Sequence, residues 1–131
     1  KALDDSQLVI NEDFFIEQPN HSMGDGYAGA QKLMGLAETP DAILAVSDDV
    51  AIGAIKYLKK IKIRIPEDVS VVGFDNGPMC IASDPELTVV SQPISKLTLD
   101  CFELIMNQIK GTTTHFEKRT INGEIIVRAS S

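Results

Sequence analysis

The chain has 131 residues, of which 44% are hydrophobic and 24% charged, and its formal net charge is −7 at pH 7. This length suits one domain with a core of its own. The negative charge argues against direct contact with nucleic acid or an anionic membrane, because phosphate binding relies on Lys and Arg. No apolar run approaches the roughly 20 residues that span a bilayer.

The sequence starts at Lys1, and we interpret it as a piece of a longer protein. Cys80 and Cys101 have no metal-ligand spacing. We therefore expect two reduced thiols, as in a cytosolic protein, and the alternative is a disulfide.

The first third of the chain predicts a short strand at residues 8–10 and a helix over residues 24–37. In the helix, apolar residues recur at helical spacing, from Tyr27 through Ala30 to Leu33. Several glycines lie at its start, which indicates close packing or a closely approached ligand. They do not form a phosphate loop, because the Gly-Lys-Ser/Thr ending is missing.

Residues 42–46, 69–74 and 87–90 are short apolar runs typical of strands buried on both faces. A helix is predicted at residues 50–60, with Ser47 or Asp48 as its cap. Another is predicted from Pro93 to Gly111. A polar strand at residues 116–121 and a last strand at 124–127 would follow. This alternation predicts an α/β fold, a parallel sheet flanked by helices.

Polar residues follow three of these strands. Ser47 and Asp48 follow the first, Asp75 and Asn76 the second, and Ser91 and Gln92 the third. The carboxyl ends of parallel strands share one edge, where such sheets bind ligands. Carboxylates accept hydroxyl hydrogen bonds and amides both donate and accept, so this edge suits a neutral polyol.

Three strings carry a resemblance to a known family: AVSDDVAIGAI from residue 45, IPEDVSVVGFDN from residue 65 and LTVVSQP from residue 87. In order and spacing they resemble the effector-binding region of the LacI/GalR family of bacterial transcription regulators. The closing IVRAS is similar to that family's end. The resemblance covers most of the chain.

The resemblance implies the C-terminal lobe of a type I periplasmic-binding-protein-like fold, in which two α/β lobes clamp a small effector, usually a sugar or nucleobase. Residues 1–92 would form the C-terminal lobe of the effector-binding domain. Residues 93–121 would belong to the mostly absent N-terminal lobe, and residues 122–131 would return to the C-terminal lobe. The apolar stripe from Leu97 to Leu104 would then lack its packing partner.

The same resemblance implies a cytoplasmic homodimeric repressor that binds operator DNA only through an absent helix-turn-helix headpiece. It implies no enzymatic activity, no cofactor and no metal. Asp75 is similar to the family's aspartate that accepts effector hydroxyls, and Gln92 to its hinge-side ligand. The remaining expected effector contacts are His21, Ser47 and Asp48, with a surface loop and a helix cap as alternatives for His21 and Asp48. The expected dimer contacts are Ile52, Met79 and Ile81.

Two other functions compete with this interpretation. A periplasmic sugar-binding protein of a transporter shares the fold and the acidic charge. A receiver-type or Mg²⁺-dependent phosphoryl-transfer domain would use Asp48, Asp49 and Asp75, but the order of these residues does not suit one and no lysine is suitably placed after Asp75.

Overall fold

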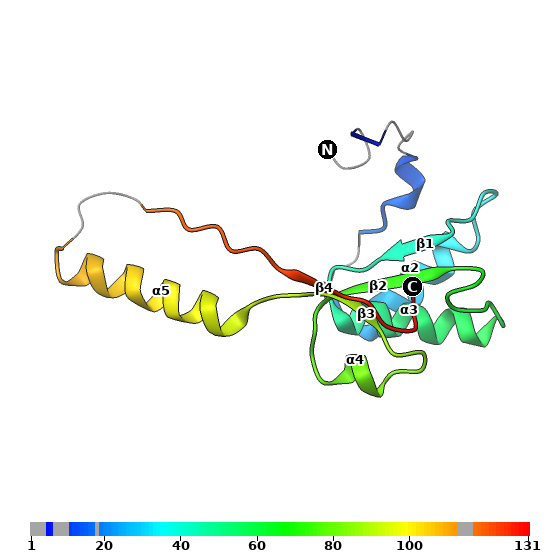
Figure 1. The fold of residues 1–131 in the computed structure, drawn as a ribbon. Coiled ribbons are helices and arrows are strands. Elements are labelled where there is room, and N and C mark those ends of the chain that lie inside the picture. The colour runs from blue at the N-terminus through cyan, green and yellow to red at the C-terminus, as the bar shows by residue number, and fades with distance from the viewer. Residues whose placement is uncertain (1–4, 7–10, 18, 113–116) are drawn as a thin grey trace.

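The computed structural model describes residues 5–6, 11–17, 19–112 and 117–131 (Figure 1). Its centre is a four-stranded sheet in the order β1-β2-β3-β4, formed by Ala42–Leu44, Ser70–Asp75, Thr88–Ser91 and Glu124–Ile126. The first three strands are parallel, and β4 is antiparallel to β3. The predicted α/β fold with a parallel sheet is confirmed.

Two helices precede β2 and pack against each other. Helix α2 (Met23–Leu33) begins at the N-cap Ser22, which forms a capping box with Asp25. Helix α3 (Asp48–Lys60) begins at the N-cap Ser47, whose hydroxyl accepts a hydrogen bond from the backbone N–H of Val50. Both start two residues or less from the predicted positions, but α2 ends at Leu33 rather than at residue 37.

The crossing of α2 and α3 depends on two glycines. A Cβ on Gly26 would lie 2.0 Å from the carbonyl oxygen of Val50, and one on Gly53 would lie 2.0 Å from that of Met23. The two backbones therefore touch, which only residues without a side chain permit.

The core lies between α3 and one face of the sheet. Ala51, Leu58, Val71, Leu87 and Val89 are fully buried there. The short helix α4 (Met79–Ala82) adds the buried Cys80 to this cluster. Strand β2 presents Val71 and Gly73 to this face, so Val72 and Phe74 point to the other one.

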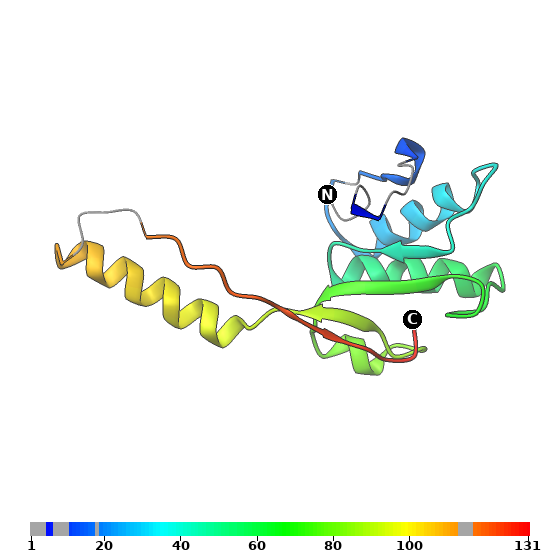
Figure 2. The ribbon, with the colours of Figure 1, turned by 45° about the horizontal axis from the view of Figure 1, so that its top comes forward.

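The second face of the sheet is apolar and partly exposed. Leu44 pairs with Val72, and Val90 pairs with both Phe74 and Ile125, so these five residues share that face. Leu44 is 75% exposed and Ile125 is 71% exposed. Figures 1 and 2 show α2 and α3 together on the opposite side of the sheet.

After β3 the chain leaves the sheet. Helix α5 (Ile94–Ile109) projects away from it, and residues 117–123 return alongside that helix to β4 (Figures 1 and 2). The strand predicted at 116–121 is wrong for residues 117–121, which are irregular, and residue 116 lies outside the described residues. These residues run beside a helix, so no strand within the described ranges lies next to them for pairing.

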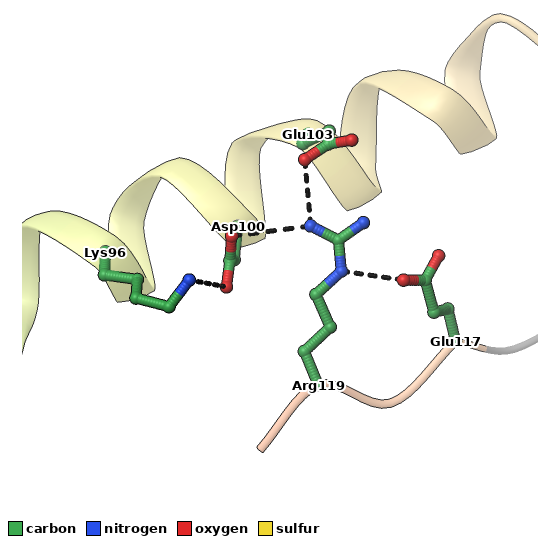
Figure 3. Close-up of polar contacts among 5 residues, drawn as sticks. All are labelled: Lys96, Asp100, Glu103, Glu117 and Arg119. Carbon is green, nitrogen blue, oxygen red and sulfur yellow. Dashed lines mark hydrogen bonds and ion pairs between the residues drawn. The ribbon is translucent and has the colours of Figure 1, made fainter. Parts of the chain in front are cut away.

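Arg119 joins the returning segment to α5 (Figure 3). Its guanidinium lies 2.8 Å from a carboxylate oxygen of Glu103, 3.4 Å from one of Asp100 and 2.7 Å from one of Glu117. Hydrogen bonds to Glu103 first, and then to Glu117, raise the pKa of Arg119. Lys96 completes the network through Asp100.

No residue of α5 is buried. Its large exposed apolar side chains are Ile94, Leu99, Phe102, Ile105 and Ile109. In the predicted stripe, Leu97 and Leu104 are half-buried, whereas Cys101 is exposed. Among the helices of the described ranges, none has the length and apolarity needed to cross a bilayer. The strand predicted at residues 8–10 lies outside the described residues.

Candidate effector site

The carboxyl ends of β2 and β3 bring two predicted site residues into contact. The Gln92 side-chain Nε2 donates a hydrogen bond to Oδ1 of Asp75. Asp75 and Ser91 are partners in the parallel register, so Gln92 follows directly beyond the edge that Asp75 occupies. Asp75 is exposed and Gln92 is half-buried. The edge therefore offers a carboxylate acceptor next to an amide that can donate and accept.

The turn after β2 has an unusual backbone. Asp75 has φ 106° and Asn76 has φ 73°, both in the left-handed region that favours glycine. The Asn76 amide donates to the Ser91 hydroxyl at 3.3 Å and accepts from the Arg128 guanidinium at 2.7 Å. The C-terminal tail thus reaches the same turn that carries Asp75.

Ser47 and Asp48 lie at the carboxyl end of β1, at the start of α3. Ser47 is half-buried, and its hydroxyl caps helix α3. Capping was one of its two predicted roles, and the other was contact with the effector. Asp48 is only 8% exposed. Its Oδ2 accepts a hydrogen bond of 2.5 Å from the backbone N–H of Gly77, in the turn after β2.

His21 lies apart from the contact between Asp75 and Gln92. It is exposed, has φ 51° and precedes α2. It lines a cavity of about 510 Å³ between α2, β1 and the segment that precedes α2. Val46, the last residue before Ser47, also lines this cavity, so the cavity reaches the carboxyl end of β1. Asp75 and Gln92 are not among its lining residues.

The residues predicted at a dimer interface differ in exposure. Met79 and Ile81 on α4 are 49% and 64% exposed, whereas Ile52 packs against the core cluster. Both cysteines are free. Burial raises the pKa of the Cys80 thiol to about 12, and the adjacent Asp48 carboxylate adds to the effect.

Within the described ranges, no three His, Cys, Asp or Glu side chains are grouped to hold a metal ion. Two of the three acidic residues invoked for phosphoryl transfer have other partners, since the Asp48 carboxylate accepts from Gly77 and the Asp75 carboxylate accepts from Gln92.

Arg128 and Asn76 were not among the predicted site residues. A signal for Arg128 was present, because a single arginine follows the apolar run Ile125 to Val127. A charged residue at that position needs a buried or half-buried partner. Nothing in the sequence identifies Asn76 as that partner, because 51 residues separate the two.

The chain belongs to the family of periplasmic binding protein-like domains, whose model matches residues 2–131. One similar curated protein is the HTH-type transcriptional repressor CytR of Escherichia coli, which is 31% identical over 127 residues. That match covers 97% of this chain and 35% of CytR, so the chain spans about a third of the length of this relative.

Solved structures of LacI-type regulators have the same fold. A putative LacI regulator from Bacillus cereus subsp. cytotoxis superposes with a TM-score of 0.92 at 25% identity, over 99% of this chain and 46% of that one. The complex of the regulator CelR with cellobiose has a TM-score of 0.91 at 28% identity, over 99% of this chain and 39% of that one. The predicted resemblance to LacI-type regulators is confirmed.

Proposed function

We propose that this chain is the effector-sensing part of a LacI-type transcription repressor, and that its effector is a small polyhydroxylated molecule such as a sugar. The observation that carries the proposal is the contact between Asp75 and Gln92 at the carboxyl ends of two parallel strands. This is the edge at which open α/β sheets bind ligands.

Each of the two residues has a chemical role. The Asp75 carboxylate accepts hydrogen bonds from effector hydroxyls, and the Gln92 amide fixes the orientation of that carboxylate and contacts the effector with its oxygen. His21 would form a second wall at the end of β1. A sugar is favoured because a similar solved regulator is a complex with cellobiose.

The other wall of the cleft would belong to a second lobe. Residues 93–121, which contain α5 and its returning segment, would belong to a second lobe, and the exposed apolar side chains of α5 would pack in that lobe. Residues 1–92 and 122–131 would form the lobe that carries Asp75. The effector would bind between the lobes.

The mechanism is a coupling of two binding equilibria rather than catalysis. Effector between the lobes stabilises one lobe arrangement, and a homodimer transmits that arrangement to helix-turn-helix headpieces on operator DNA. The proposed dimer contacts are the exposed Met79 and Ile81, together with Ile52, which packs against the core cluster. The protein would work in the cytoplasm. A transporter component would share the site, but the similar CytR is a repressor.

A thermal-shift screen of the full-length protein with cellobiose, glucose, cytidine and hypoxanthine tests the proposal, because a ligand selective for the folded state raises the melting temperature. Calorimetry with the best ligand should show that Asp75→Ala costs roughly 2–4 kcal/mol of binding free energy. Glu86→Ala removes an exposed carboxylate before β3 and is the matched control. Unchanged affinity in Asp75→Ala would remove Asp75 from the site.

A further inference from the structure

The turn that carries Asp75 is held in a conformation that its own residues disfavour. Asp75 and Asn76 are consecutive, neither is glycine, and both have positive φ. Such a backbone persists only where surrounding contacts fix it. Two charged side chains from distant parts of the sequence make those contacts, Asp48 from α3 and Arg128 from the C-terminal tail.

Asp48 supports the turn through Gly77. Its carboxylate accepts the Gly77 N–H through Oδ2, while Oδ1 has no hydrogen-bond partner among the described residues and is fully buried. A Cβ on Gly73 would lie 2.8 Å from a Leu87 methyl carbon and 3.2 Å from this Oδ1, so the glycine in β2 leaves room for both side chains. A carboxylate buried between the Gly77 N–H and the Cys80 thiol is costly, and a helix N-terminus alone does not require it.

Asp49, the next residue in α3, shows that the helix end does not require a buried carboxylate. Asp49 also lies in the first turn of α3, where a carboxylate complements the positive end of the helix. Asp49 is exposed, however, and so supplies that charge without burial. What Asp48 alone provides is the bond to Gly77.

Arg128 supports the turn through Asn76. One guanidinium nitrogen donates to the carbonyl oxygen of Leu87 at 2.5 Å, and the other donates to Asn76 Oδ1 at 2.7 Å. Asn76 in turn donates to Ser91, the residue before Gln92. The backbone of Arg128 is itself fixed, because its N–H donates to Thr88 Oγ1 at 2.8 Å.

We infer that Asp48 and Arg128 are positioning residues of the effector site, which act through the turn at residues 75–77 and do not touch the effector. Asp48 fixes the Gly77 end of the turn, and Arg128 fixes Asn76. Between them Asp75 keeps its carboxylate against Gln92. The role in effector binding rests on the proposed function, whereas the anchoring of the turn does not.

The anchoring is tested without ligand, by residue-resolved amide hydrogen exchange of the full-length protein. In Asp48→Ala the Gly77 amide should exchange roughly tenfold faster or more, because a charge-assisted hydrogen bond is lost. Asp48→Asn keeps the shape and an acceptor, so its change should be smaller. Asp49→Ala is the control and should leave Gly77 unchanged. Equal exchange at Gly77 in Asp48→Ala and the parent protein would overturn the inference.

The role of Arg128 is tested with Arg128→Lys, which keeps the positive charge but loses the planar guanidinium and its paired N–H donors. The Asn76 side-chain amide resonance should shift as its bonds to Arg128 and Ser91 are broken, with the fold retained. An unmoved Asn76 resonance would contradict the role assigned to Arg128.

The effector role is tested by a double-mutant cycle with cellobiose as the probe. If Asp48 acts through Asp75, Asp48→Asn should weaken binding several-fold in the parent protein but less than about twofold in an Asp75→Asn background. Equal losses in both backgrounds would show a merely structural role. If neither cellobiose nor glucose binds the parent protein, the sugar proposal fails, while the exchange measurement still decides whether Asp48 anchors the turn.

Discussion

The Gln92 amide donates to the Asp75 carboxylate, so the end of β2 is tied to the residue at which the chain leaves the sheet for α5. Gln92→Ala should therefore weaken effector binding by about 1 kcal/mol, because Asp75 loses a donor that orients it. Gln92→Glu should weaken it further, since two carboxylates would then face each other. Calorimetry of both variants gives the order, and equal affinities would contradict it.

Because α2 and α3 touch at Gly53, adding one methyl group there should strongly destabilise the fold. Gly53→Ala would place a Cβ against the backbone of Met23, which cannot move without moving α2. The expected loss is about 3 kcal/mol or more in the free energy of unfolding. Gly24→Ala is the matched control, because that Cβ meets only the Ser22 hydroxyl at 3.5 Å. Denaturant unfolding should show the control as neutral or slightly stabilised.

The ion pairs of Arg119 should slow amide exchange in the segment that returns beside α5. Arg119→Ala should speed amide exchange in residues 117–121 several-fold, because this side chain joins the returning segment to Asp100 and Glu103 on α5. Lys96→Ala leaves those contacts in place and should change the segment little. Equal exchange in both variants would show that other contacts hold the segment.

The ion pair between Arg64 and Asp68 should make the stability of the fold depend on pH in the acid range. Hydrogen bonds from the Arg64 side chain and backbone lower the pKa of Asp68 to about 2, from an ordinary value of 3.8. The carboxylate therefore stabilises the fold fully above pH 3.8, and this contribution is lost as the pH falls through about 2. Urea unfolding of Asp68→Asn should differ from that of the parent protein at about pH 5, and the difference should shrink below this window.

The sequence predicted most of the fold because the three parallel strands are short apolar runs separated by turn residues. It also placed Asp75 and Gln92 at one edge, since strand ends in a parallel sheet share that edge. The error at residues 117–121 has a simple cause: a polar strand was predicted there, but a strand needs a neighbour to pair with. No local pattern reports whether one exists.

The contacts that hold the site in place could not be predicted from the sequence. The sequence predicts Asp48 as an effector contact or a helix cap. Its burial against Gly77 depends on how α3 lies over β2, which the sequence pattern does not show. Arg128 reaches Asn76 only because β4 returns beside β3 in antiparallel register. Contacts of this kind follow from tertiary packing, which spacing within one element does not encode.

The antiparallel pairing of β3 and β4 has a consequence for protein engineering. Ser91 and Glu124 face each other in the register, so residues 92–123 occupy the place of a hairpin loop. A two-residue Asn-Gly turn has the right twist to join such strands. Replacing the whole excursion with that turn would delete the exposed apolar side chains of α5 while leaving all four strands, and would yield a minimal scaffold for study by itself.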